Sequence, residues 1–373
     1  MTPHQLRILF VAKWYPHPED PQNGVFVRNH ALAAAKFAKV GVIYLGGKPH
    51  PDEPKEYSTE FGDIREYRIM SPFEGNTILR WNKKRKAFKR GVRHIFGKRN
   101  PDVIHLHVLS PDQIIATTYA RKKDIPVVLT EHWSGYLNGA FEEMVRPKQQ
   151  SFRYLARQAK KVLPVSEFLG KWMSRKLGVQ TEVLPNVVVL PDERDTQKNE
   201  DFTFVVLADM VDEVKQISET IEAFAEHLNS FPKDKLLLIG GGPDESSLRN
   251  HAASHLPNGS YEFTGRLPQP EALTVMTKGH VLVVNSLYET FGVVGLEALS
   301  LGLPVVCRRC GGPEEIMPDG GTLFYDDSPR AYMKQARENY NELKDAIDPA
   351  SLERFSPERI AERMERIYRE VSS

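Results

Sequence analysis

Two carboxylates eight residues apart, Glu289 and Glu297, have the residue type and spacing to bind hydroxyl groups. They lie in residues 281–316, where the pattern predicts a buried strand, a polar loop, a helix, a second strand and a glycine loop. Ligands of open α/β sheets bind outside the carboxyl ends of the strands, and a helix N-terminus, here after Gly292, attracts anions. The segment therefore predicts one crevice for a phosphate and two hydroxyl groups. Without that context, the two glutamates would be typical of a core helix with a solvent-exposed face.

The same segment resembles the signature of the retaining GT-B glycosyltransferases of family four, also called group 1. The matching pieces are Glu289-Thr-Phe-Gly, Leu-Glu297-Ala, Gly-x-Pro-Val and Gly-Gly-x-Glu-Glu, in register with one another. The resemblance implies that Glu289 orients the hydroxyls of a donor sugar and that Glu297 binds the ribose of its nucleotide. It also implies donor contacts from the residues after Glu289, which are Thr290, Phe291, Gly292 and Val293.

Two residues of the first half match the same family. A buried strand, Leu6–Ala12, and a Pro-rich loop precede Gly24, which begins a helix, and this order is typical of a nucleotide-binding domain. The resemblance implies that Gly24 approaches the donor phosphates, although a helix start alone would explain a glycine there. His132 ends the strand Pro126–His132. The resemblance implies that it contacts the donor sugar, whereas a lone histidine is more often structural.

The resemblance implies that Lys215, at the start of a helix predicted over Gln216–His227, binds the donor diphosphate, although a solvent-exposed lysine at a helix start is the alternative. The family usually pairs this lysine with an arginine, but Asp209 occupies the arginine position here. An aspartate would repel a diphosphate. Either the arginine role is absent, or another cation such as Arg28 or Arg266 supplies it, or the register of the match is shifted.

Two further motifs lie in the second half. Gly-Arg266-Leu267 resembles the family segment that flanks the nucleobase through its backbone. Cys307 and Cys310 form a CxxC pair, but zinc needs about four ligands and the sequence has no second pair. We therefore expect no metal site.

Short apolar strands alternate with amphipathic helices along most of the chain, which predicts parallel βαβ units. With the family resemblance, we expect the α/β GT-B fold, two Rossmann-like parallel-sheet domains facing a central cleft. The expected domains are residues 1–188 on the acceptor side and 189–355 on the donor side. A final amphipathic helix, 356–373, is expected to cross back to the first domain. Residues 187–201 read as the linker.

The composition is that of an ordinary globular protein, and no apolar run approaches the ~20 residues of a membrane span. The N-terminus lacks the pattern of a signal peptide, and two cysteines make no disulfide framework. We expect a cytoplasmic protein. The polar, Pro-containing residues 48–63 read as a surface loop.

The net charge of +1 hides an asymmetry between the two halves. Residues 1–186 carry 31 Lys and Arg against 17 Asp and Glu (+14), and residues 187–373 carry 19 against 32 (−13).

The segment Arg80–Arg99 holds ten basic residues and no acid, with Trp81, Phe88, Val92 and Ile95 near one helical face. This pattern is typical of a helix on the inner, anionic face of a membrane. A packed helix with a basic solvent face and a contact with an anionic soluble acceptor are the alternatives. Nucleic acid is not an expected partner, because no recognised nucleic-acid module accompanies the segment.

We therefore expect an enzyme that moves a sugar from a nucleotide-diphosphate donor, UDP- or GDP-linked, to a hydroxyl of a glycan or lipid-linked glycan, with retention at the anomeric carbon. Lys215 and the amides at Gly292 would stabilise the departing diphosphate, so neither a metal nor a cofactor is predicted. The sequence shows no committed nucleophile, which favours front-face attack. The alternatives are a nucleotide-sugar epimerase or a phosphorylase on the same fold, and a non-catalytic nucleotide-sugar sensor or subunit.

Overall fold

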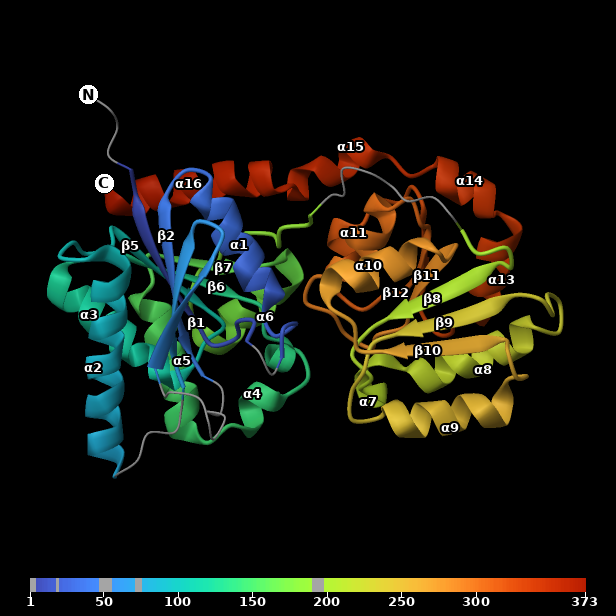
Figure 1. Ribbon diagram of the computed structural model, residues 1–373, viewed down its shortest axis with the longest axis horizontal. Helices are drawn as coiled ribbons and strands as arrows, with labels where there is room; N and C mark the ends of the chain where they lie inside the picture. Colours follow the sequence, from blue (N-terminus) through green and yellow to red (C-terminus); the bar gives the residue numbers. More distant parts are fainter. Residues whose placement is uncertain (1–4, 18–19, 47–55, 71–75, 190–197) are drawn as a thin grey trace. The chain divides into compact units, whose positions relative to one another are not determined.

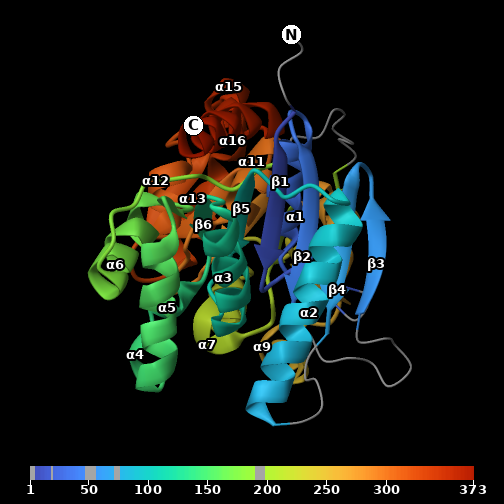
Figure 2. The same ribbon diagram turned by 90° about the vertical axis from the view of Figure 1, so that its left-hand side faces the viewer.

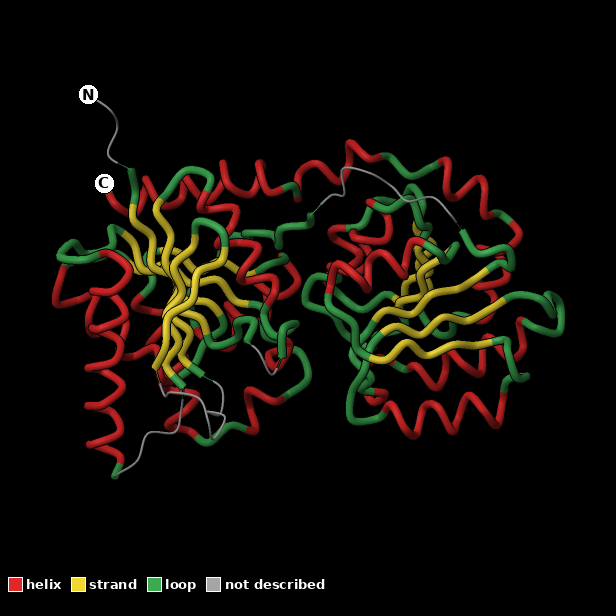
Figure 3. The backbone as a smooth tube through the Cα atoms, viewed as in Figure 1, coloured by secondary structure: helices red, strands yellow, loops and turns green. Residues whose placement is uncertain are grey.

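The computed structural model describes residues 5–17, 20–46, 56–70, 76–189 and 198–373. The chain forms two compact units, which we call unit 1 (Met1–Val187 with Pro357–Ser373) and unit 2 (Val188–Ser356). Each unit has its own β-sheet covered by helices, as Figures 1 and 3 show. Most of the expected linker, residues 190–197, lies outside the described residues.

The sheet of unit 1 has the strand order β3-β4-β2-β1-β5-β6-β7. All neighbouring strands pair in parallel except β3, which pairs antiparallel with β4. The strands are β1 (Arg7–Ala12), β2 (Lys39–Leu45), β3 (Glu56–Phe61), β4 (Ile64–Ile69), β5 (Val103–His107), β6 (Val127–Glu131) and β7 (Lys161–Pro164).

Helices cover both faces of this sheet (Figure 2). Because side chains alternate along a strand, Val40 and Val42 of β2 join the core under α1 and α16, while Gly41 contacts Ile95 of α2 on the other face. The helices and 3₁₀ turns of unit 1 are α1 (Val25–Ala35), α2 (Thr77–Phe96), η1 (Pro111–Gln113), α3 (Ile114–Lys123), η2 (Ser134–Tyr136), α4 (Ala140–Glu143), α5 (Arg146–Gln158), α6 (Glu167–Leu177) and α16 (Pro357–Ser372).

Helix α2 contains most of the basic segment, and its apolar stripe is packed rather than free. Phe88, Val92 and Ile95 are buried, as the packed-helix alternative predicts. Its N-terminal turns keep large apolar side chains in solvent, with Ile78 73% exposed and Trp81 41% exposed. The apolar side chains of α2 that remain exposed thus lie at its N-terminal end.

Unit 2 is built on a sheet of parallel strands in the order β10-β9-β8-β11-β12-β13. Its strands are β8 (Thr203–Leu207), β9 (Lys235–Ile239), β10 (Tyr261–Gly265), β11 (Val281–Val284), β12 (Val305–Arg308) and β13 (Thr322–Tyr325). Its helices are α7 (Asp212–Lys215), α8 (Ile217–His227), α9 (Glu245–His255), α10 (Gln269–Thr277), α11 (Val293–Ser300), α12 (Gly312–Ile316), α13 (Arg330–Glu338), α14 (Tyr340–Asp345) and α15 (Pro349–Leu352), with the 3₁₀ turn η3 (Glu353–Phe355).

The strand order places β8 and β11 side by side at the centre of this sheet, where the order of the strands reverses. The segments that follow these two strands carry Asp209, Lys215, Glu289 and Gly292, with Lys215 at the end of the short α7. Such a switch point is where open α/β sheets bind their ligands. The fold of unit 2 thus brings the chemistry-bearing residues of the second half to one edge.

Three local expectations are wrong. The predicted surface loop 48–63 contains strand β3, which pairs with β4 through Glu56–Phe61, while residues 47–55 lie outside the described part of the chain. Lys215 does not begin the following helix, because it ends the short α7, and the left-handed Gln216 (φ 50°) separates α7 from α8. The sequence also predicts one helix over residues 328–343, which is instead broken at Asn339 into α13 and α14.

The last helix, α16, belongs to unit 1. It is strongly amphipathic and packs its buried face, including Met364 and Ile367, against α1. The buried hydroxyl of Tyr368 lies 2.7 Å from Nδ1 of His105 in β5. Core packing and a buried polar contact therefore both join α16 to the sheet.

Candidate active site

Lys215 and Glu289 form an ion pair at the carboxyl edge of the unit 2 sheet. The Lys215 Nζ donates to Glu289 Oε1 at 2.5 Å, although 74 residues separate the two in sequence. Burial alone lowers the pKa of Lys215, but the negative charges of Glu289 and then Asp209 outweigh it, so that the pKa is raised. Lys215 therefore stays a cation, next to Glu289, the carboxylate that is expected to orient the hydroxyls of the sugar.

The backbone on both sides of Glu289 is fixed by hydrogen bonds. Its N–H donates to the Cys310 carbonyl at 2.9 Å, and its carbonyl accepts from Gly312 N–H at 3.0 Å. Ser286 Oγ donates to Glu289 Oε1 at 2.8 Å. The N–H of Leu287 donates to the Val214 carbonyl at 2.9 Å, which links this loop to α7. These hydrogen bonds thus fix the loop that carries Glu289 relative to α7, which ends at Lys215.

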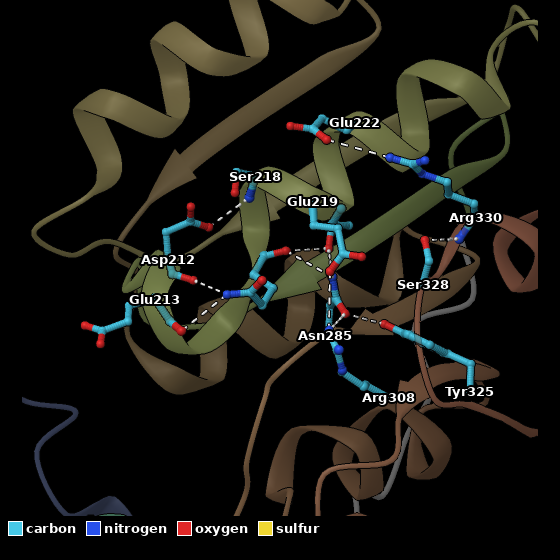
Figure 4. Close-up of polar contacts among 12 residues, drawn as sticks. Asp212, Glu213, Ser218, Glu219, Glu222, Asn285, Arg308, Tyr325, Ser328 and Arg330 are labelled. Atoms are coloured by element: carbon cyan, nitrogen blue, oxygen red, sulfur yellow. Dashed lines mark hydrogen bonds and ion pairs between the residues drawn. The ribbon is translucent and has the colours of Figure 1, made fainter. Parts of the chain in front are cut away.

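Asn285, buried at the end of β11, is the centre of a polar network (Figure 4). Its Nδ2 donates to the carbonyl of Gln216 at 3.1 Å and to Glu219 Oε2 at 3.0 Å. Its Oδ1 accepts from Tyr325 Oη at 2.6 Å, and Arg308 pairs with Glu219 at 3.3 Å. The network ties the ends of β11, β12 and β13 to the residue after Lys215.

Gly292 caps the N-terminus of α11 in a left-handed conformation with φ 92°, which L-residues rarely adopt. A Cβ at this position would lie 2.9 Å from Pro313 Cγ. Val293 is the first residue of α11, and the N–H groups of a first helical turn have no partner within the helix. The backbone at Gly292 and Val293 therefore offers an anion site beside Glu289.

The two residues between Glu289 and Gly292 differ in burial. Phe291 is buried and packs edge-on against Phe355, with ring centroids 5.7 Å apart. Thr290 is half-buried, and its carbonyl lies against Gly312. The side chain of Phe291 thus anchors the loop and cannot itself reach a ligand.

Glu297 lies inside α11 and is only 7% exposed. Its Oε1 accepts from Gln269 Nε2 at 2.6 Å, and Gln269 is the first residue of α10. Burial raises the pKa of Glu297 to about 7, although the Gln269 hydrogen bond works in the opposite direction. The result is a buried carboxyl poised between its two protonation states near neutral pH.

Asp209 and Arg266 meet at the same edge. Arg266 Nη2 donates to Asp209 Oδ1 at 2.7 Å and to the Gly241 carbonyl at 3.0 Å. Leu267, next in the chain, is half-buried. Of the two arginines suggested above, Arg266 is the one that reaches Asp209. Arg28 belongs to unit 1, where it lies 3.5 Å from Glu66.

Gly24 occupies the expected place at the start of α1. It is left-handed with φ 66°, and a Cβ there would lie 2.5 Å from the Trp14 carbonyl carbon. The position therefore requires glycine for the fold itself, which is the alternative stated above. A contact between Gly24 and the donor phosphates stays a prediction.

His132 follows β6 directly and is buried among aromatic rings. Its ring centroid lies 4.3 Å from that of Phe26 and 5.7 Å from those of His30 and His107. Burial lowers the pKa of all three histidines, to about 4 for His30, so that they are neutral at physiological pH. His132 can thus act as a neutral hydrogen-bonding group.

Three residues of the site were not predicted. Asn285 is the last residue of the strand predicted over Val281–Asn285, and Ser286 follows it; polar residues at a strand end are the signal that could have found both. Gln269 opens a helix that the sequence interpretation omitted. The two cysteines of the CxxC pair are buried and form no disulfide. None of the described helices is long and apolar enough to cross a bilayer.

Two family models match consecutive parts of the chain. The model for Glycosyltransferase Family 4 matches residues 24–190, and the model for Glycosyl transferases group 1 matches residues 191–366. A curated relative is the "Putative teichuronic acid biosynthesis glycosyltransferase TuaC" of Bacillus subtilis (strain 168). It is 26% identical over 342 residues, which cover 82% of each chain.

Solved structures resemble the chain over nearly its whole length. Sucrose-phosphate synthase from Thermosynechococcus elongatus has a TM-score of 0.78 at 18% identity and covers 98% of this chain and 99% of its own. HepE from Anabaena, in complex with UDP and glucose, has a TM-score of 0.71 at 14% identity and covers 98% and 100%. Identities this low bear on the fold alone, and the fold is GT-B. With the two family models, this chain belongs to the group 1 glycosyltransferases.

Proposed function

We propose that this glycosyltransferase moves a sugar from a nucleotide-diphosphate donor to a hydroxyl of a glycan or lipid-linked glycan, with retention at the anomeric carbon. The observation that carries the proposal is the grouping of Lys215, Glu289 and the α11 N-terminus at one sheet edge of unit 2. A cation and amides that have no partner within their helix suit a diphosphate, and a fixed carboxylate suits sugar hydroxyls.

The diphosphate would be stabilised as it departs by Lys215 and by the amides of Gly292 and Val293. A preorganised donor of this kind contributes about 3–4 kcal/mol where it has been measured. Lys215 already pairs with Glu289, so a bound diphosphate would share the lysine with that carboxylate. This arrangement would supply positive charge at the leaving group without a metal, and we propose metal-independent transfer.

The nucleoside would be held by Glu297, whose carboxylate can accept two hydroxyl hydrogen bonds from a ribose. Gln269 occupies one of its oxygens and orients it. HepE, which shares the fold, was solved in complex with UDP and glucose, and this supports a uridine donor, with a GDP-linked donor as the second candidate. Leu267 and the backbone at Arg266 would flank the base.

The transfer step would proceed by front-face attack. The bond from the anomeric carbon to the diphosphate breaks, and the acceptor oxygen bonds to the same face while its proton passes to the leaving phosphate. Glu289 would orient the sugar hydroxyls and stabilise the positive charge on the ring. His132, neutral and at a strand end, would contact the sugar as the family resemblance implies.

The acceptor is proposed to be anionic or lipid-linked. Residues 1–186 carry a net charge of +14, and α2 presents Lys86, Lys89 and Arg93 to solvent. The name of the TuaC relative refers to teichuronic acid, which supports an anionic polysaccharide. With the exposed Ile78 and Trp81, the basic face of α2 supports peripheral binding to the inner face of a membrane.

Donor binding is the first test. EDTA-treated protein and its Glu297→Ala variant would be heated with a panel of nucleotides and nucleotide sugars. We expect one nucleotide diphosphate and its sugar to raise the wild-type melting temperature without metal, and Glu297→Ala to lose the shift. Release of free sugar from that donor would exclude a non-catalytic sensor. A wild-type protein that no nucleotide stabilises would overturn the proposal.

A further inference from the structure

Helices α8 and α9 of unit 2 bring three metal-ligating side chains together, away from the candidate active site. His251 and His255 lie four residues apart on α9 and therefore on one face of the helix. Their ring centroids are 4.1 Å apart. Glu222 projects from the neighbouring α8, and one ligand atom from each of the three residues lies within 4.8 Å of the others.

The tautomer of His255 can be deduced from its hydrogen bond. Its Nδ1 lies 2.8 Å from the carbonyl oxygen of His251. Ser254 Oγ also lies 3.0 Å from Nδ1, but its hydroxyl donates to the same carbonyl at 2.8 Å. A carbonyl only accepts, so we assign the proton to Nδ1 and the lone pair to Nε2. Histidines that bind metals nearly always donate their second ring N–H to a carbonyl or a carboxylate in this way. His255 is thus orientated as a metal ligand, and its side chain is exposed.

The geometry of His251 suits a shared ion better than a hydrogen bond. Its Nε2 is buried and has no hydrogen-bond partner within the described part of the chain. It lies 3.3 Å from Glu222 Oε1, whereas a charge-assisted N–H···O bond is about 2.7–2.9 Å long. Two ligands at about 2.0–2.1 Å from a tetrahedral zinc ion stand about 3.3 Å apart.

We propose that Glu222, His251 and His255 bind one first-row transition-metal ion, with Zn²⁺ as the best fit. Two imidazoles and one carboxylate are a borderline-soft ligand set, which also accepts Ni²⁺ and Cu²⁺ but not Mg²⁺ or Ca²⁺. Three protein ligands leave the fourth tetrahedral position to water.

The surroundings of Glu222 agree with this assignment. Arg330 approaches Glu222 Oε2 at 3.7 Å, as Figure 4 shows, and leaves Oε1 directed at His251. The guanidinium of Arg330 also pairs with Glu226 at 3.2 Å. Glu226 thus offsets the positive charge of Arg330, which would otherwise oppose a metal cation.

The ion would join α8 to α9. Helix α8 begins directly after Gln216, whose carbonyl Asn285 holds in the network described above. A ligand that binds only the folded state stabilises it in proportion to the logarithm of its concentration over Kd. Zn²⁺ is therefore expected to raise the melting temperature, whether or not a nucleotide is present.

The test uses the full chain without an affinity tag, stripped of metal and titrated calorimetrically with ZnCl₂. We expect one Zn²⁺ per chain in the wild type, and an affinity at least about tenfold weaker in His251→Ala and His255→Ala. Glu222→Gln should also weaken binding. His94→Ala, which removes an exposed histidine of α2, is the matched control and should bind as the wild type does.

The variants' unliganded melting temperatures check that they fold, and His255, being exposed, should be replaceable without loss of the fold. Co²⁺ gives a second measurement, since its visible absorption bands in the wild type should disappear in His255→Ala. The proposal is overturned if Zn²⁺ does not bind, or if His251→Ala and His255→Ala bind it as the wild type does. The latter result would direct attention to His30, His107 and His132, the buried histidine group of unit 1.

Discussion

Glu297 illustrates how burial sets the chemistry of a single residue. A carboxylate in α11 that binds ribose hydroxyls has to be ionised, yet its burial favours the neutral acid and raises its pKa to about 7. In the proposed function, the affinity for the donor therefore depends on pH through the protonation state of the Glu297 carboxyl. Hydrogen bonds from a ribose would favour the ionised form and lower this pKa again when the donor binds.

The first prediction concerns this proton. Donor affinity should be about tenfold weaker at pH 6 than at pH 8, because the Glu297 carboxyl is protonated below its pKa of about 7. Calorimetric titration across this range measures the effect. Glu297→Gln should bind more weakly and show a much flatter profile. A wild-type profile as flat as that of the variant would argue against ribose binding by Glu297.

The second prediction concerns Lys215. Lys215→Ala should lower kcat by roughly 100- to 1,000-fold, because it removes a fixed positive charge that acts on the departing diphosphate. Steady-state kinetics with the donor identified above would measure it. Lys235→Ala, at the amino end of β9, is the control and should leave kcat unchanged. An equal loss in both variants would point to general destabilisation.

The third prediction concerns Arg266, which pairs with Asp209 where the family has its arginine. If Arg266 supplies that second cation, Arg266→Ala should raise the donor Kd by roughly 10- to 100-fold, the effect of losing a charged hydrogen bond. Asp209→Asn should keep or improve affinity, because it removes a carboxylate near the phosphates. Unchanged binding in Arg266→Ala would exclude Arg266 as that second cation.

The sequence predicts the site residues that lie within short motifs. It does not predict contacts between residues that are far apart in the chain. Glu289 and Glu297 were predicted because they lie in short motifs, Glu289-Thr-Phe-Gly and Leu-Glu297-Ala, that resemble the family signature. The partner of Glu297, Gln269, lies 28 residues earlier, and Asn285 meets Gln216 across 69 residues. Only the strand order brings these residues together, so no local pattern could reveal these two contacts.

At the scale of elements, α2 shows why an amphipathic pattern is ambiguous. The same apolar stripe can be buried against a bilayer or against a sheet, and the residues of the stripe do not say which. In the fold, Phe88 and Ile95 complete the core of unit 1. The short strand β3 was missed for a related reason, since its polar residues at an exposed sheet edge resemble a loop.

The fourth prediction concerns the basic face of this helix. Lys86→Glu with Lys89→Glu should weaken binding to anionic lipid vesicles at least about tenfold, since each basic residue contributes about 1 kcal/mol. Cosedimentation at low and moderate salt would measure it, and the melting temperature should stay unchanged. Lys171→Glu with Arg175→Glu, on α6, makes the same charge change as a control. Equal vesicle binding by both double variants would exclude α2 as the membrane contact.

At the scale of the whole molecule, the two units differ in how they are built. Unit 2 is one continuous stretch, Val188–Ser356, whereas unit 1 is completed by the last helix. The buried face of α16 contributes Ile360, Met364, Ile367 and Tyr368 to the unit 1 core. Burying each such side chain stabilises the fold by about 1.5–3 kcal/mol, which is large against a total of about 5–15 kcal/mol.

The fifth prediction follows from this construction. Removing the chain from Pro357 onward should destabilise unit 1 strongly and leave unit 2 folded. Hydrogen exchange read by mass spectrometry would show the amides of β1, β2 and β5 losing protection, while those of β8, β9 and β11 keep theirs. Tyr368→Phe, which removes one hydroxyl from the core, is the mild control. Equal loss of protection in both units would contradict the prediction.

The discontinuity of unit 1 also has a consequence on the ribosome. Synthesis runs from the N-terminus, so the sheet of unit 1 emerges before the helix that covers it. The whole of unit 2 is made in between, which takes roughly 10 to 30 s at about 5–20 residues per second. During that interval, the apolar surface that awaits α16 is open to chaperones or to neighbouring nascent chains, so the later unit can finish folding first.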